Sequence, residues 1–245
     1  MIMKYNFPKS VKEISKPDKF CPGCGHSILL KTLGMVIDDL GIAQKTLIGV
    51  DIGCSLLAWD YFDVATVQTH HGRTVPVISG YKKVLSEKIG IVYVGDGGAY
   101  AIGLQSLITS ANRNDPILVI VVNNTLYGMT GGQLAPTTLD KEITSTTPEG
   151  KDSSEKGKTF LGPELINNVA NKKAYIARCM ATQPLVVKKT LAKAIENQMK
   201  NNSFSFVEVL SMCPTNWRKN AKESIEFIEK DMQRVFKLGE FNKLQ

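Results

Sequence analysis

Short runs of β-branched and other apolar residues alternate along this chain with longer amphipathic stretches, and glycine or asparagine punctuates them. Strands are predicted for residues 46–51, 89–94, 117–122, 174–177 and 204–210. Helices are predicted for residues 27–40, 75–87, 99–112, 163–171, 184–200 and 219–236. Three of the predicted strands are almost entirely apolar, as parallel strands buried on both faces are. The pattern therefore predicts an α/β fold with a doubly wound, mostly parallel sheet.

Two segments depart from this alternation. One is the N-terminal arm before Cys21, and the other covers residues 125–160, which are rich in Thr, Gly, Pro, Lys and Asp. A stretch of that length without regular structure inside a compact domain is usually functional or mobile. We expect residues 1–245 to form a single domain that carries this N-terminal arm and a C-terminal helical extension.

Composition excludes several classes of protein. The longest unbroken apolar run, residues 117–122, is far shorter than the roughly 18 residues that a membrane-spanning helix needs. The first twenty residues hold no apolar stretch of signal-peptide length, and five cysteines are an odd count for a secreted disulfide scaffold. The net charge of +7 includes no run of five or six basic residues, and aromatic residues make up only 7%. We therefore expect a cytoplasmic globular enzyme with neither a membrane nor nucleic acid as partner.

Oxygen-bearing side chains follow two successive predicted strands. Gly95-Asp96-Gly97 follows one strand, Asn123-Asn124 follows the next, and 28 residues separate Asp96 from Asn124. Ligands of parallel α/β sheets bind beyond the carboxyl ends of the strands. Carboxylate and amide oxygens suit Mg²⁺ bound together with substrate phosphates, and glycines let backbone N–H groups approach a diphosphate at a helix start. The pattern favours a magnesium–diphosphate site.

The alternatives at this point are a glycine turn with unrelated asparagines and a nicotinamide site. A dinucleotide fingerprint requires glycine three positions after Gly97, where this chain has Tyr100. The spacing therefore argues against a nicotinamide. The chain also lacks a G-x-x-x-x-G-K loop, so a nucleoside triphosphate site is unsupported.

Four cysteines form a second candidate site. Cys21 and Cys24 have the CxxC spacing, and Cys54 and Cys213 can complete a four-sulfur ligand set. Sequence alone does not separate a structural zinc site from a 4Fe-4S cluster, and an isolated CxxC pair with unrelated cysteines is a further alternative. Cys179 has apolar neighbours and is interpreted as a small buried residue.

The motifs occur in an order that resembles the β subunit of 2-oxoacid:ferredoxin oxidoreductases, over about residues 20–218. In order they are CPGCGH (21–26), IGCS (52–55), HGR (71–73), GDG (95–97), NN (123–124), YGMTGGQ (127–133), PTT (136–138) and CPTNW (213–217). The GDG and NN pair resembles the diphosphate-binding motif of thiamine-diphosphate enzymes. The segment STTPEGKD (145–152) is most similar to members that act on 2-oxoglutarate or branched-chain 2-oxo acids.

The resemblance implies thiamine diphosphate, Mg²⁺ and one 4Fe-4S cluster as cofactors. The implied Mg²⁺ ligands are Asp96, Asn124 and the carbonyl of Leu126, and the implied cluster ligands are Cys21, Cys24, Cys54 and Cys213. The other residues expected at the cofactor are Gly53, Cys54, Ser55, His71, Gly95, Gly97, Gly98, Asn123, Tyr127, Gly128 and Thr130. His71 and Arg73 are the candidate catalytic residues. Many relatives have an acidic residue where this chain has Gly98, which puts the local cofactor contacts in question.

The implied reaction is the oxidative decarboxylation of a 2-oxo acid to acyl-CoA and CO₂, with electrons passing through the cluster to ferredoxin. The substrate is expected to be 2-oxoglutarate or a branched-chain acid rather than pyruvate. The glutamate that activates thiamine is expected on an α subunit, with γ and ferredoxin-like δ subunits as further partners. The alternatives are a non-redox thiamine-diphosphate decarboxylase or synthase subunit with a four-cysteine zinc site, and a non-catalytic binding subunit.

Overall fold

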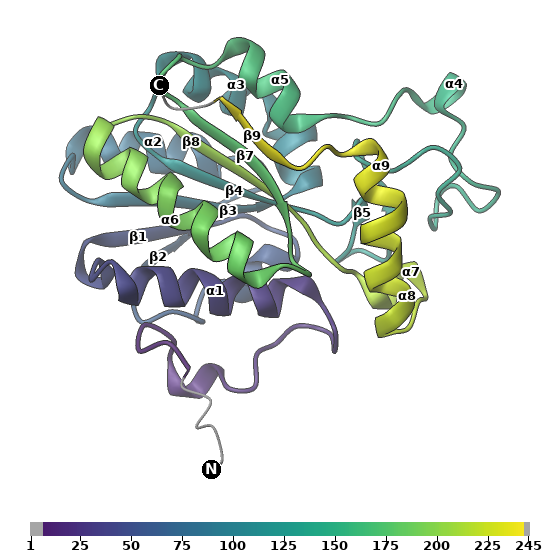
Figure 1. The fold of residues 1–245 in the computed structure, drawn as a ribbon, viewed down its shortest axis with the longest axis horizontal. Helices are drawn as coiled ribbons and strands as arrows, with labels where there is room; N and C mark the ends of the chain where they lie inside the picture. Colours follow the sequence, from purple (N-terminus) through teal and green to yellow (C-terminus); the bar gives the residue numbers. More distant parts are fainter. Residues whose placement is uncertain (1–6, 243–245) are drawn as a thin grey trace.

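The protein folds around a seven-stranded sheet with the strand order β2-β1-β3-β4-β8-β7-β9 (Figure 1). The computed structural model describes residues 7–242, so the beginning of the expected N-terminal arm lies outside the described residues. The strands are β1 (Thr46–Val50), β2 (Ala65–Gln68), β3 (Ile89–Gly95), β4 (Leu118–Asn123), β7 (Tyr175–Met180), β8 (Ser205–Leu210) and β9 (Gly239–Asn242). Every pairing is parallel except that of β7 with β9. The predicted α/β fold with a mostly parallel sheet is confirmed.

Helices cover both faces of this sheet. Helices α1 (Gly25–Asp39) and α6 (Pro184–Asn201) contact one another on one face, and α2 (Thr74–Val84), α3 (Leu104–Arg113) and α5 (Gly162–Val169) lie on the other (Figure 1). Each face has its own hydrophobic cluster. Within residues 7–242, no helix combines the length and the apolar composition that crossing a membrane requires.

The central strands are apolar because both of their faces are buried. Along β3, Ile91 and Tyr93 belong to the cluster under α1 and α6, whereas Val92 and Val94 belong to the opposite cluster. Side chains that alternate between two cores are therefore apolar or aromatic along β3 and along β4 as far as Val122. The first charged or amide side chains come at the carboxyl ends of these two strands, with Asp96 after β3 and Asn123 as the last residue of β4.

The sheet includes two strands that the sequence analysis did not predict. Strand β2 carries no apolar run because it is an edge strand that is only partly buried. Strand β9 follows the predicted C-terminal helix, which the structure forms as α8 (Ala221–Glu226), η5 (Phe227–Met232) and α9 (Gln233–Val235). The expected helical extension therefore returns to the sheet and ends as its antiparallel edge.

The segment predicted to be irregular contains little regular structure. Residues 125–160 form the short hairpin of β5 (Leu126–Tyr127) and β6 (Gln133–Leu134), the single turn α4 (Ser153–Lys156) and connecting turns. The arm before Cys21 has one 3₁₀ turn, η1 (Glu13–Ser15). The remaining short elements are η2 (Ala43–Lys45), η3 (Cys54–Ala58), the π-helical turn η4 (Gly98–Ile102) and α7 (Pro214–Trp217).

The central position of β4 leads to a stability prediction. Ile120 on β4 is 0% exposed, whereas Ile143 in the irregular segment is 68% exposed. We expect Ile120→Ala to lower the free energy of unfolding by about 2–5 kcal/mol, because it leaves a cavity in the core. Ile143→Ala, the matched control, should change it by about 0.5 kcal/mol or less. Urea unfolding of both variants measures the difference, and equal losses would contradict the assigned core.

Candidate functional site

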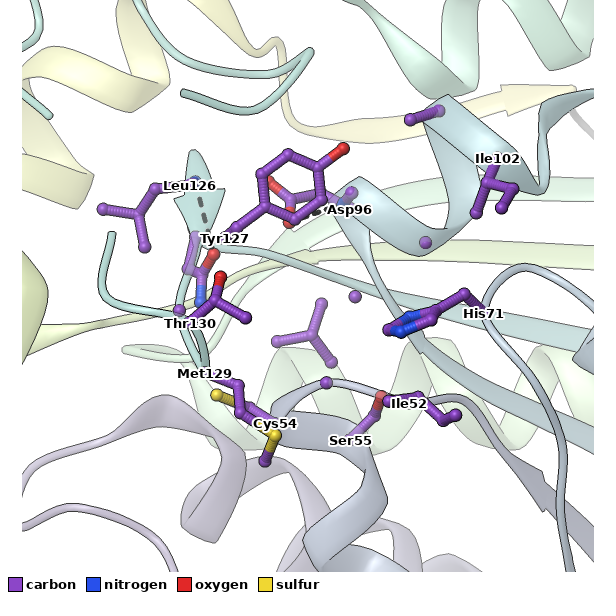
Figure 2. A pocket seen from close by; sticks show the side chains of 18 of the residues that line it. Ile52, Cys54, Ser55, His71, Asp96, Ile102, Leu126, Tyr127, Met129 and Thr130 are labelled. Atoms are coloured by element: carbon purple, nitrogen blue, oxygen red, sulfur yellow. Dashed lines mark hydrogen bonds between the residues drawn. The ribbon is translucent and has the colours of Figure 1, made fainter. Parts of the chain in front are cut away.

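A cavity of about 250 Å³ opens at the carboxyl edge of β1, β3 and β4 (Figure 2). Its walls come from the turn after β1, the loop before α2, the turn after β3 and the segment after β4. The predicted site residues that line it are Gly53, Cys54, Ser55, His71, Gly95, Asp96, Gly97, Gly98, Asn124, Leu126, Tyr127, Gly128 and Thr130. Four segments that are far apart in sequence thus meet at the cavity, beside the GDG and NN motifs.

Asp96 is the most buried charged group of this cavity, with 3% of its surface exposed. One carboxylate oxygen, Oδ1, accepts a hydrogen bond from the backbone N–H of Gly97 at 2.9 Å, and Oδ2 accepts one from the hydroxyl of Thr137. Burial raises the pKa of Asp96 to about 7, although these two hydrogen bonds oppose the rise. A buried carboxyl of this kind is stabilised in its charged form by a nearby cation. Asn124, also buried, presents an amide in the same cavity.

Close packing fixes the glycines of the turn after β3. A Cβ atom on Gly97 would lie 2.1 Å from Cε1 of Tyr127, and one on Gly98 would lie 2.1 Å from Oδ2 of Asp51. Gly98 therefore has no room for the acidic side chain that many relatives have at this place. At this point the carboxylate of Asp51, directly after β1, occupies the space that such a side chain would need.

Asp51 is a site residue that the sequence analysis missed. It is fully buried directly after β1, where its Oδ1 accepts hydrogen bonds from the Gly72 N–H at 2.8 Å and the Thr74 hydroxyl at 3.3 Å. Its Oδ2 has no hydrogen-bond partner among the described residues, and burial raises its pKa. Asp51 holds the loop that carries His71. It is the last residue of the strand predicted for residues 46–51, and an acidic residue at the carboxyl end of a strand was the available signal.

The structure separates the two candidate catalytic residues. His71 lines the cavity, whereas Arg73 is exposed outside it and donates a hydrogen bond to the Ile102 carbonyl at 3.2 Å. Asn123 is likewise absent from the cavity lining. Its Oδ1 accepts from the Thr125 N–H at 3.1 Å, so it shapes the turn in which Thr125 adopts φ of 63°. That turn presents Asn124 to the cavity.

The four candidate cluster cysteines come from three segments that pack together. Cys54 lines the cavity, Cys24 and Cys213 are buried, and Cys21 is exposed. The N–H of Gly25 donates to the Met212 carbonyl at 3.1 Å, which joins the CxxC segment to the chain beside Cys213.

Burial raises the pKa of Cys24 to about 12 and that of Cys54 to about 11. Charge repulsion from Cys21 and Cys213 adds to both rises. Within residues 7–242, no three His, Cys, Asp or Glu side chains converge as ligands of a single ion. In a 4Fe-4S cluster each cysteine binds a different iron, so such a cluster does not require that convergence. Cys179 lies elsewhere, buried on β7.

His26 is a second residue that the sequence analysis did not place at the site. It lines the cavity, its Nδ1 lies 2.6 Å from the Tyr93 hydroxyl oxygen, and its ring stacks on Phe20 with a centroid distance of 4.8 Å. Burial lowers the pKa of His26 to about 3, so the imidazole is neutral. Its place at the end of CPGCGH was a signal, but a single histidine in an apolar setting did not distinguish a site from a core.

The irregular segment, residues 125–160, makes hydrogen bonds to the turn after β4 that lines the cavity. Glu142 accepts hydrogen bonds from the Thr125 hydroxyl and, at 2.8 Å, from the Leu139 N–H. The buried Lys151 donates from Nζ to the Thr138 carbonyl at 2.7 Å. These bonds tie residues 138–151 to the turn that follows β4.

Comparisons with known proteins agree with this geometry. A family model described as "Thiamine pyrophosphate enzyme, C-terminal TPP binding domain" matches residues 51–209. The chain is 34% identical over 232 residues to the 2-oxoglutarate synthase subunit KorB of Archaeoglobus fulgidus. The aligned residues cover 95% of this chain and 83% of that protein. This chain belongs to the 2-oxoacid:ferredoxin oxidoreductase family of thiamine pyrophosphate enzymes.

Other members of the family differ in length. The ketoisovalerate oxidoreductase subunit VorA of Methanothermobacter marburgensis is 40% identical over 225 residues, which are 91% of this chain and 47% of VorA. The present chain thus spans about half the length of that relative. A solved 2-oxoglutarate:ferredoxin oxidoreductase from Magnetococcus marinus, with 2-oxoglutarate, coenzyme A and succinyl-CoA bound, matches with a TM-score of 0.80 and 26% identity. That match covers 93% of this chain and 74% of the other.

Glu142 makes the stability of this family member depend on pH. Burial raises the pKa of Glu142 from its ordinary value of 4.5 to about 7, so the folded state binds more protons than the unfolded state between these values. Its contribution to stability is therefore fully present below about pH 4.5 and is lost as the pH rises to about 7.

We expect the unfolding free energy of the native protein, relative to Glu142→Gln, to fall by roughly 1–3 kcal/mol over this range. Urea unfolding at several pH values measures it, with Glu149→Gln, an exposed glutamate of the same segment, as the matched control. Parallel stability curves for the native protein and Glu142→Gln would show that the carboxyl is not perturbed by its surroundings.

Proposed function

We propose that this chain is the β subunit of a CoA-dependent 2-oxoacid:ferredoxin oxidoreductase. The supporting observation is that Cys54, one of the four candidate cluster ligands, lines the same cavity as Asp96 and Asn124, the candidate Mg²⁺ ligands (Figure 2 shows Cys54 and Asp96). An iron–sulfur cluster held at that wall would adjoin the diphosphate-binding turn. A redox thiamine enzyme requires this juxtaposition, whereas a non-redox one does not.

The residues of the cavity fit thiamine diphosphate and Mg²⁺. Asp96, Asn124 and the carbonyl of Leu126 would hold the cation, and the backbone N–H of Gly98 would face the diphosphate. Burial raises the pKa of Asp96, and a bound divalent cation would lower it again by stabilising the ionised carboxylate. Thiamine diphosphate, when bound, supplies the electron sink for decarboxylation of a 2-oxo acid.

The chain does not carry the whole active site. Asp96 is the only carboxylate that lines the cavity within residues 7–242, and it is assigned to the cation. The glutamate that activates thiamine would then come from an α subunit that closes the open side, where His71, Met129 and Thr130 are exposed. His71 would face the reacting end of the cofactor, and the exposed Arg73 would attract the substrate carboxylate.

Electron transfer and substrate choice complete the proposal. Cys21, Cys24, Cys54 and Cys213 would hold a 4Fe-4S cluster that passes electrons to ferredoxin, with γ and ferredoxin-like δ subunits completing a cytoplasmic complex. The substrate would be 2-oxoglutarate or a branched-chain 2-oxo acid rather than pyruvate. The names of the KorB and VorA relatives and the segment 145–152 support this choice.

Metal content tests the cluster directly. We expect the anaerobically purified complex to contain about four irons at this site, and Cys213→Ser to lose them because one of four thiolate ligands is gone. Cys179→Ser is the matched control, since it changes a buried cysteine that lies on β7. Elemental analysis of all three proteins reports iron and zinc together. Stoichiometric zinc in place of iron would instead support a non-redox enzyme with a structural zinc site.

A further inference from the structure

Tyr100, which stands where a dinucleotide fingerprint would have glycine, is buried in the π-helical turn η4 directly after the GDG motif. Its hydroxyl donates a hydrogen bond to Oε1 of Glu208 on β8. The other carboxylate oxygen of Glu208 accepts from Nε of Arg178 on β7. Both Glu208 and the Arg178 side chain are fully buried. The turn is thus anchored to an ion pair inside the protein.

Arg178 has partners for its whole guanidinium group. Nη1 and Nη2 donate to the two carboxylate oxygens of Glu164 on α5, each at 2.7 Å, and Nη1 also donates to the Lys237 carbonyl at 3.0 Å. Its central carbon lies 5.2 Å from the ring centroid of Phe236 and 5.4 Å from that of Phe241. The bidentate pair with Glu164 fixes the guanidinium, and its Nε–H holds Glu208 through one further hydrogen bond. Glu208 therefore offers Tyr100 an acceptor whose position does not change.

The turn η4 connects Tyr100 to the cavity, because it also contains Gly98, which lines the cavity. The N–H of Gly103 donates to the carbonyl of Gly98 at 2.9 Å, which closes the wide π-helical turn around Tyr100. The end of the turn touches the His71 loop, since a Cβ atom on Gly72 would lie 2.5 Å from the nitrogen of Gly103. One turn therefore sets the direction of the diphosphate-facing Gly98 and supports the loop of His71. π-Helical turns are frequent at functional sites.

Tyr100 itself does not line the cavity, so it acts only through this turn. Its ring packs against Phe160 with a centroid distance of 5.0 Å. On its other side, a Cβ atom on Gly162 would lie 2.1 Å from the Tyr100 hydroxyl oxygen, so only glycine fits there. Phe160 and Gly162 therefore hold the ring closely, with its hydroxyl on Glu208.

We propose that Tyr100, Glu208 and Arg178 form a positioning network that holds η4 in the conformation needed to bind the diphosphate of the cofactor. The inference rests on the proposed function, because it concerns how tightly the same cavity binds thiamine diphosphate. Tyr100 is a positioning residue, and removal of its hydroxyl weakens cofactor binding without removing any group that touches the cofactor.

The test compares Tyr100→Phe with Tyr175→Phe. Tyr175 on β7 is also buried and also donates its hydroxyl to a glutamate, Glu240, at 3.1 Å, but it belongs to neither the cavity lining nor the network. Both variants lose a phenol hydroxyl that donates to a glutamate, although Glu208 is fully buried and Glu240 is partly exposed. For each purified complex, depleted of thiamine diphosphate and Mg²⁺, the dissociation constant for thiamine diphosphate at saturating Mg²⁺ and the melting temperature without cofactor are measured.

We expect Tyr100→Phe to raise the dissociation constant about three- to tenfold, as the loss of one hydrogen bond does, and to change kcat at saturating cofactor by less. Tyr175→Phe should lower the melting temperature and leave the dissociation constant unchanged. An unchanged dissociation constant in Tyr100→Phe, or an equal rise in both variants, would overturn the positioning role. Failure of the unmutated complex to bind thiamine diphosphate would overturn the proposed function, and this inference with it.

Discussion

The candidate site depends on the parallel alignment of β1, β3 and β4. The pairing of Val50 with Tyr93 and of Gly95 with Val122 brings the carboxyl ends of these strands to one edge. The first polar residues after these strands therefore meet, although long stretches of sequence separate them. The helices on both faces make this possible, because they bury the strands so completely that polar side chains occur only at their ends.

Carboxylates that are partly or fully buried then position the loops around the cavity. Asp51 holds the His71 loop, Glu142 holds the turn after β4, and Glu208 holds the π-helical turn after β3. Asp96 is held in turn by Gly97 and Thr137. Burying a charge is unfavourable unless hydrogen bonds or a counter-charge compensate it. Glu208 has Arg178 as its counter-charge. Asp96 has only hydrogen bonds, which do not offset the effect of burial on its pKa, and a bound cation would supply the missing counter-charge.

Much of the fold followed from the sequence, because the central strands are buried on both faces and carry uninterrupted apolar runs. The edge strands β2 and β9 did not follow, because short and partly exposed strands have no such pattern. At the site, the meeting of Asp96 and Asn124 in one cavity could be predicted from their places at the carboxyl ends of neighbouring strands. The hydrogen bonds of Asp51, Glu142 and Tyr100 could not, because their partners are 17 to 108 residues away in the chain. His26 shows the same limit, since its contact with Tyr93 spans 67 residues.

The central claim is that one cavity joins a thiamine site to an iron–sulfur cluster. Electron paramagnetic resonance of the anaerobic complex, frozen after addition of a 2-oxo acid and CoA, tests it most directly. We predict that 2-oxoglutarate or a branched-chain 2-oxo acid produces the signal of a reduced 4Fe-4S cluster in the unmutated complex, and that Cys213→Ser lacks the signal of this cluster. Turnover of the 2-oxo acid with no reduced-cluster signal in the unmutated complex would contradict the account.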